Sequence, residues 1–191
     1  MSNFYSKEFQ EKNIQAHSND SKWGASSEYM FVIRKRLYYL QDIVTLLKPK
    51  SILDYGCGKG LALSSLKSYT PEIRLVKYEP FIDEFNSLPT ETFDLVICYN
   101  VLQIVEAEYF DRVIDHIYSL SSKYILLAMN YDHQINNRSC DSLNRSPEWY
   151  FSKLSRLKIK YLRRDLDHNG IAYSIDGQPS RCSVCYFLIK K

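Results

Sequence analysis

The segment from Ile52 to Gly60 constrains the fold of this chain more than any other. It reads Ile-Leu-Asp-Tyr-Gly-Cys-Gly-Lys-Gly, so a short apolar run leads directly into three glycines at alternate positions. Glycines at the end of a strand let the backbone turn tightly into a helix and approach a ligand closely. The following residues, Gly60–Lys67, read as a short helix. We therefore expect a strand, a glycine turn and a helix, with a ligand site at the turn.

Strands and helices alternate along the rest of the chain. Ahead of the glycine segment, apolar residues at steps of three and four predict one long helix that Pro49 ends. The residues of this stripe are Met30, Ile33, Leu37, Leu40, Val44 and Leu47. The predicted strand Ser51–Tyr55 leads into the glycine turn. The later predicted strands are Ile73–Glu79, Phe93–Tyr99, Lys123–Met129, Leu157–Tyr161 and Cys182–Ile189. The later predicted helices are Ala107–Leu120 and one that starts at Ser146–Glu148. This alternation favours a doubly wound α/β fold: a mostly parallel sheet, covered on both faces, with its ligand crevice at the carboxyl ends of the strands.

The composition is typical of one folded domain. The 191 residues are 45% hydrophobic and 25% charged, and we interpret residues 1–191 as a single domain with residues 1–25 as an N-terminal cap or lid. The formal net charge of +3 gives no indication of a nucleic-acid partner. No apolar stretch is long enough to span a bilayer, so we expect no membrane partner. Five cysteines without paired spacing indicate free thiols in a reducing, cytoplasmic compartment.

Two acidic residues flank the predicted turn. Asp54 precedes the first glycine, and Glu79, 25 residues further on, ends the next predicted strand. An acid at that strand end lies beside the glycine turn, where it can accept two hydrogen bonds from a ribose diol. Asp54 would repel a pyrophosphate but can help to hold an ammonium group, and the Gly-x-Gly-x-Gly spacing differs from the dinucleotide pattern. These features favour a cofactor with an amino-acid end and no phosphate over NAD.

This segment resembles motif I of the class I S-adenosylmethionine-dependent methyltransferases, with Glu79 at the position of the acid that holds the ribose hydroxyls. Phe93–Val105 looks like the fourth strand of that family and the loop after it, where cofactor and substrate meet. The resemblance implies a single Rossmann-like methyltransferase domain whose last strand, Cys182–Ile189, is antiparallel and lies between two parallel strands. It also implies S-adenosylmethionine as cofactor. The residues implied to bind it are Asp54, Tyr55, Gly56, Cys57, Gly58, Glu79, Pro80, Phe81, Asn100 and Val101.

One unit of this family is short in the chain. Only residues 80–92 separate Glu79 from Phe93, which is too few for the usual helix and third strand. We therefore expect this unit to be reduced to a loop. Phe81 and Ile82 then become candidates for contact with the adenine ring.

The methyl acceptor is inferred from missing motifs and from residues at the rim of the crevice. The chain lacks the Asp/Asn-Pro-Pro-Tyr motif of amino-methylating nucleic-acid enzymes, and it has no Pro-Cys dipeptide to supply the nucleophile of a cytosine-C5 enzyme. We favour a small-molecule acceptor, with a nucleic acid as the alternative. Tyr99, Asn130 and Tyr131 are candidate substrate residues. His133, which follows an Asp, is the candidate general base.

Other interpretations stay open beside methyl transfer. They are a non-catalytic, cofactor-binding member of the same fold and an NAD- or nucleotide-dependent enzyme on a similar sheet. We expect no metal site, because Cys182 and Cys185 are three residues apart on a strand and face opposite sides. The basic run from Lys153 to Arg164 is interpreted as protection of an edge strand, with a nucleic-acid stripe as the alternative. Tyr5 and Trp23 are candidates for a lid over the cofactor.

Overall fold

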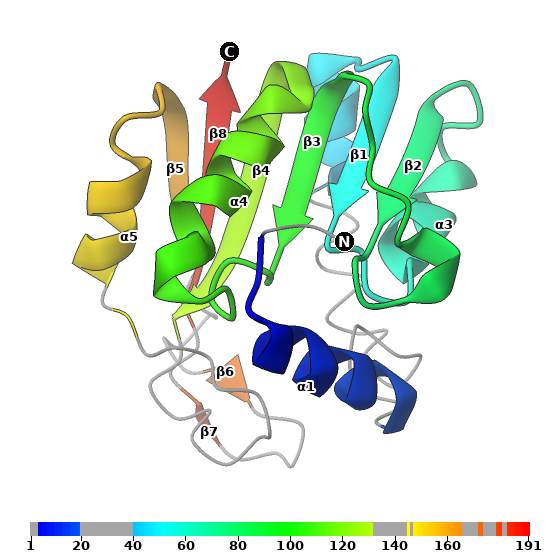
Figure 1. The fold of residues 1–191 in the computed structure, drawn as a ribbon. Coiled ribbons are helices and arrows are strands. Elements are labelled where there is room, and N and C mark those ends of the chain that lie inside the picture. Colours follow the sequence, from blue (N-terminus) through cyan, green and yellow to red (C-terminus); the bar gives the residue numbers. More distant parts are fainter. Residues whose placement is uncertain are drawn as a thin grey trace.

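A six-stranded, mostly parallel sheet forms the centre of the molecule (Figure 1). The computed structural model describes residues 4–19, 40–131, 145, 147–165, 172–173, 179–180 and 183–191. In sheet order the strands are β2 (Arg74–Tyr78), β1 (Ser51–Tyr55), β3 (Phe93–Tyr99), β4 (Ser121–Tyr131), β8 (Ser183–Lys190) and β5 (Ile159–Asp165). Only β8 is antiparallel to its neighbours, β4 and β5. The predicted fold class and the predicted place of the last strand are thus confirmed.

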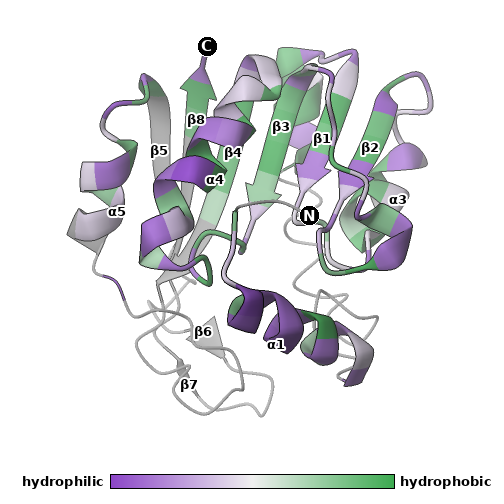
Figure 2. Cartoon of the chain, viewed as in Figure 1, coloured by the Kyte–Doolittle hydropathy of each residue, from purple (hydrophilic) through white to green (hydrophobic). Residues whose placement is uncertain are grey.

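Helices cover both faces of this sheet. α4 (Ala107–Ser119) and α5 (Pro147–Leu154) lie on one face, and α3 (Leu61–Lys67) lies on the other with the helical residues 40–47 (Figure 1). The apolar stripe predicted for α4 is buried: Phe110, Val113, Ile114, Ile117 and the following Leu120. Figure 2 shows the same division, with apolar strands inside and hydrophilic helix surfaces outside.

The chain departs from some predicted boundaries at the far side of the sheet. β5 begins at Ile159 and continues to Asp165, beyond the predicted Leu157–Tyr161, because β8 pairs with it along its whole length. β6 (Ala172–Tyr173) and β7 (Pro179–Ser180) pair as a separate two-stranded sheet. The predicted stripe residues Met30, Ile33 and Leu37, as well as Trp23, Ser146 and Cys182, lie outside the described residues.

Residues 80–92 contain no strand, as the short spacing predicts. The only regular element among them is the 3-10 helix η2 (Asp83–Phe85). β2 is therefore an edge of the sheet, on the side where a third βα unit would otherwise pair.

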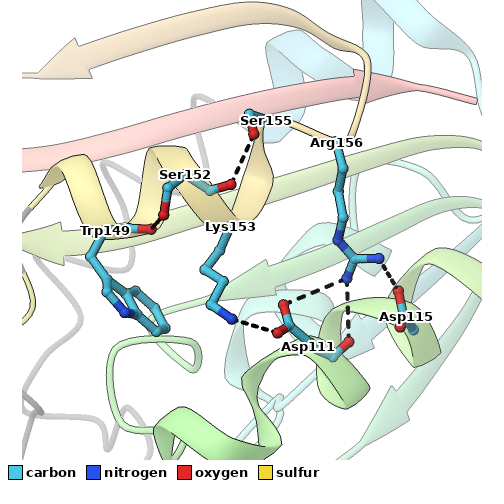
Figure 3. A network of polar contacts seen from close by, with 7 residues as sticks. All are labelled: Asp111, Asp115, Trp149, Ser152, Lys153, Ser155 and Arg156. Atoms are coloured by element: carbon cyan, nitrogen blue, oxygen red, sulfur yellow. Dashed lines mark hydrogen bonds and ion pairs between the residues drawn. The ribbon is translucent and has the colours of Figure 1, made fainter.

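The basic residues around α5 are paired with acids of α4 (Figure 3). Lys153 Nζ lies 2.5 Å from an Asp111 carboxylate oxygen, and Arg156 Nη1 lies 2.6 Å from one of Asp115. These two cations of the basic run fasten α5 to α4. They do not form part of an unpaired nucleic-acid stripe. The edge position predicted for the following strand is confirmed, because β5 ends the sheet.

The N-terminal helix α1 (Lys7–Asn19) lies across the carboxyl ends of the central strands (Figure 1). Tyr5, just before it, is buried and packs in the core under α4. None of the helices that the structure describes is long and apolar enough to cross a membrane.

We expect Phe110→Ala to lower the free energy of unfolding by about 3–5 kcal/mol. The Phe110 ring is fully buried and packs 4.8 Å, centroid to centroid, from Trp149 of α5, so truncation leaves a cavity between the two helices. Urea denaturation measures the change. Leu46→Ala is the matched control: Leu46 is 74% exposed, and its loss should change stability by under about 0.5 kcal/mol. Equal effects in the two variants would contradict this packing.

Candidate functional site

The three glycines after β1 form a turn that only glycine accommodates well. Gly56, Gly58 and Gly60 have φ of 76°, 54° and 69°, in the left-handed region that side chains disfavour. At Gly56 a Cβ atom would also lie 2.2 Å from Cγ2 of Val101. The turn therefore packs directly against the segment that follows β3.

Backbone hydrogen bonds join this turn to the end of β2. The amides of Gly56 and Cys57 both donate to the carbonyl oxygen of Tyr78, at 2.7 and 3.1 Å. The amide of Gly58 donates to Oε2 of Glu79 at 3.0 Å. The predicted ribose-binding acid thus lies beside the glycine turn, as the spacing indicates.

Glu79 is buried, with 6% of its surface exposed. Burial raises the pKa of its carboxyl to about 7, although the amide of Gly58 and the more distant amide of Phe81, 3.4 Å from Oε1, act in the opposite direction. Its Oε1 lies 3.8 Å from Nε2 of His17 in α1.

Asp54 is a second buried carboxyl, and it is the last residue but one of β1, just before the glycine turn. It is 3% exposed and lies opposite Lys77 in the β1–β2 register. Burial and the charge of Glu79 raise the pKa of Asp54 to about 7, and Lys77 offsets part of this shift. A buried carboxylate is costly unless cations or hydrogen-bond donors accompany it. The pair therefore suits a ligand that brings positive charge and hydroxyl groups, and it opposes a diphosphate.

The end of β3 supplies the next part of the site. Tyr99 is its last residue, and Asn100 follows with a φ of 56°, a left-handed conformation that Asn tolerates better than most residues. The amide of Asn100 donates to the carbonyl oxygen of Ala128 in β4 at 2.9 Å. Val101 then closes against Gly56, so three strand ends meet at one place.

The predicted acceptor side is described only in part. Asn130 and Tyr131 belong to β4, which extends two residues beyond the predicted end because they pair with Val184 and Ser183 of β8. They remain at the carboxyl end of the strand, where the crevice is expected. His133, the predicted general base, lies outside the described residues.

The N-terminal segment contributes more than the sequence indicated. Tyr5 and Phe9 pack against Phe81, with ring centroids 5.2 and 5.8 Å away. His17 reaches Glu79, a contact for which no sequence signal exists, because α1 is far from β2 in the chain. Within the described part of the chain, no group of three or more His, Cys, Asp or Glu side chains could hold a metal ion.

Comparison with known families decides what kind of domain this is. Residues 29–170 match the family described as methyltransferase domain. The chain belongs to this family. The match spans β1, the glycine turn, Glu79 and the end of β3, so these parts of the site lie within the matched residues, and α1 lies ahead of them. The chain is a methyltransferase by family. No curated protein matches the sequence.

Solved structures of methyltransferases share the fold. The plantazolicin methyltransferase BpumL, solved in complex with SAH, is 13% identical, with a TM-score of 0.58 over 97% of either chain. Magnesium protoporphyrin IX methyltransferase from Synechocystis PCC 6803, solved with bound SAM, is 14% identical, with a TM-score of 0.55 over 96% of this chain and 92% of its own. TehB from Haemophilus influenzae is 13% identical, with a TM-score of 0.53 over 81% of this chain, which spans 62% of TehB.

We expect the stability of this methyltransferase domain to fall as the pH rises from about 4 to about 7. Asp54 and Glu79 have folded-state pKa values of about 7, against about 4 in an unfolded chain. The folded state therefore binds more protons in this window, so the ionisation of the two groups costs no stability below pH ~4 and its full amount above pH ~7. In Glu79→Gln the slope should be weaker, with stability at about pH 8 raised by on the order of 3 kcal/mol.

Urea denaturation of wild type and Glu79→Gln at several pH values measures this difference. Glu91→Gln is the control, because Glu91 is exposed and pairs with Arg74 away from the site. Parallel pH profiles for wild type and Glu79→Gln would show that the carboxyl of Glu79 is not buried as described.

Proposed function

We propose that this methyltransferase binds S-adenosylmethionine at the glycine turn and methylates a small-molecule acceptor. The observation that carries the proposal is the pair of buried carboxyls, Asp54 and Glu79, beside a turn whose backbone can approach a ligand closely. A sulfonium cofactor with an ammonium group and a ribose fits these two carboxyls, because both of its groups donate hydrogen bonds. The SAH and SAM in two structural neighbours support the choice.

We assign the binding roles to residues at the three strand ends. Asp54 would accept hydrogen bonds from the ammonium group, and Glu79 from the ribose hydroxyls. Phe81 would pack against the adenine ring. Asn100, which follows β3 and precedes Val101 beside Gly56, would also contact the cofactor. The remaining residues proposed to line this site are Tyr55, Gly56, Cys57, Gly58, Pro80 and Val101.

The chain's own chemical task in such a reaction is modest. When bound, the sulfonium supplies a methyl group that is already electrophilic, so the protein has to align a nucleophile and exclude water. We assign the positioning of the acceptor to Tyr99, Asn130 and Tyr131, at the carboxyl ends of β3 and β4. His133 would act as general base where the acceptor is protonated at working pH.

Two observations support a small molecule over a nucleic acid. Lys153 and Arg156 are engaged with acids of α4, which removes two cations from any basic stripe. Among the structural neighbours, one is a plantazolicin methyltransferase and another a magnesium protoporphyrin IX methyltransferase. We further propose a reducing, cytoplasmic location, in line with the buried free thiols of Cys57 and Cys98.

We expect S-adenosylhomocysteine, and not NAD, to raise the melting temperature of the protein. At a hundred times its dissociation constant a ligand adds about 2.7 kcal/mol, which is roughly 5–10 °C for a domain of this size. A shift with NAD alone would overturn the assignment. After a shift with S-adenosylhomocysteine, labelled methyl transfer to pools of small molecules and of RNA distinguishes the two acceptor classes. Transfer to neither pool would favour a non-catalytic member.

Glu79→Ala and Gly58→Val should each weaken binding of S-adenosylhomocysteine at least about tenfold. The first removes the acceptor of the ribose hydroxyls, and the second places a branched side chain on a residue with a positive φ in the turn. Isothermal titration calorimetry measures the affinity, and circular dichroism checks that each variant is folded. Glu91→Ala, an acid removed from an exposed loop, should bind like wild type. Unchanged affinity in both site variants would remove the basis for the assignment.

A further inference from the structure

α1 buries a polar face and exposes an apolar residue. Asn13 is 5% exposed and the side chain of His17 8%, whereas Ile14 is 49% exposed. Asn13 and His17 are one helical turn apart, so they lie on the same face. The buried amide of Asn13 is satisfied within the helix, where its Nδ2 donates to the carbonyl oxygen of Phe9 at 2.8 Å. The face of α1 that carries Asn13 and His17 is thus directed inward, and His17 on this face lies next to Glu79.

The polar face of α1 reaches the carboxylate proposed to hold the ribose. Nε2 of His17 lies 3.8 Å from Oε1 of Glu79, and each side chain is 8% exposed. This distance exceeds that of a hydrogen bond. Burial and the positive charge of Lys59 lower the pKa of His17 to about 4, so at neutral pH the imidazole is neutral and the contact is no ion pair. A neutral imidazole offers one N–H donor and one acceptor nitrogen, which complements a hydroxyl group.

Contacts near the start of α1 hold the helix in this position. The amide of Ser6 donates to Oε2 of Glu106 at 2.8 Å, and Phe4 stacks on His116 of α4 at 4.6 Å. Tyr5 and Phe9 pack against Phe81, next but one to Glu79 in the chain. α1 therefore touches both residues proposed for the nucleoside: Phe81 through its first turn and Glu79 through its last.

On the basis of the proposed cofactor, we propose that α1 is a wall of the ribose subsite and that His17 hydrogen-bonds a ribose hydroxyl beside Glu79. Oε2 of Glu79 accepts the amide of Gly58 at 3.0 Å, whereas Oε1, the oxygen nearer His17, lies at the longer distance of 3.4 Å from the amide of Phe81. A hydroxyl at this place donates to Oε1 of Glu79 and accepts the N–H of His17. His17 thereby becomes a determinant of specificity for a ribonucleoside.

The test compares two ligands in four forms of the full chain. Isothermal titration calorimetry gives the Kd of S-adenosylhomocysteine and of its analogue without the two ribose hydroxyls, for wild type, His17→Ala, His17→Gln and Gln15→Ala. We expect His17→Ala to weaken S-adenosylhomocysteine about tenfold and the analogue less than about twofold, because only the former has the hydroxyls. His17→Gln keeps an N–H donor and should recover part of the loss. Gln15, exposed on the same helix, is the matched control and should behave as wild type.

The outcomes separate this inference from the proposed function. Equal losses for both ligands, or no loss for either, would overturn the role of His17 and leave cofactor binding intact. A wild-type protein that binds neither ligand would overturn the proposed function, and this inference with it. Thermal melts show whether His17→Ala is folded. If it is not, His17→Phe takes its place, because it fills the space of the imidazole without an N–H donor. A ratio of the two Kd values for His17→Phe equal to that of wild type overturns the inference.

Discussion

The carbonyl oxygen of Tyr78 accepts two amides, those of Gly56 and Cys57, and the arrangement of the strand ends around Glu79 depends on these hydrogen bonds. They fix the turn after β1 to the end of β2, so that the amide of Gly58 meets Glu79. Both amides can point to one oxygen because Gly56 adopts a positive φ, which a side chain would disfavour. The lack of a side chain at Gly56 also admits Val101, so the same residue brings the segment after β3 into the site.

The two buried carboxylates need nearby cations or hydrogen-bond donors, and the folded chain supplies these only in part. Glu79 receives two backbone amides, and Lys77 offsets some of the cost at Asp54, yet the pKa of both groups remains raised. Nζ of Lys77 is itself directed to the hydroxyl of Ser64, at 2.8 Å. A positively charged ligand meets this need, because a nearby cation lowers the pKa of a carboxyl. The site is thus arranged for affinity at some expense of stability.

Local pattern predicted the parts of the fold that depend on short stretches of sequence. The glycine spacing located the turn, the position of Glu79 placed the acid beside it, and the brevity of residues 80–92 predicted the missing strand. Contacts made over long sequence distances were beyond such reasoning. His116 of α4, for example, stacks on Phe4 and lies 3.0 Å from the hydroxyl of Tyr55. The apolar periodicity of α4 carries no information about contacts with the N-terminal segment.

The N-terminal helix lies beside the loop that replaces the third βα unit. Without a further strand beside β2, the residues after Glu79 would lack a neighbour on that side of the sheet. α1 supplies one, since Tyr5 and Phe9 pack on Phe81 and His17 lies next to Glu79. Through His17 this helix also brings a polar side chain to within 3.8 Å of the carboxylate of Glu79. The N-terminal segment therefore lies directly against the residues that follow β2.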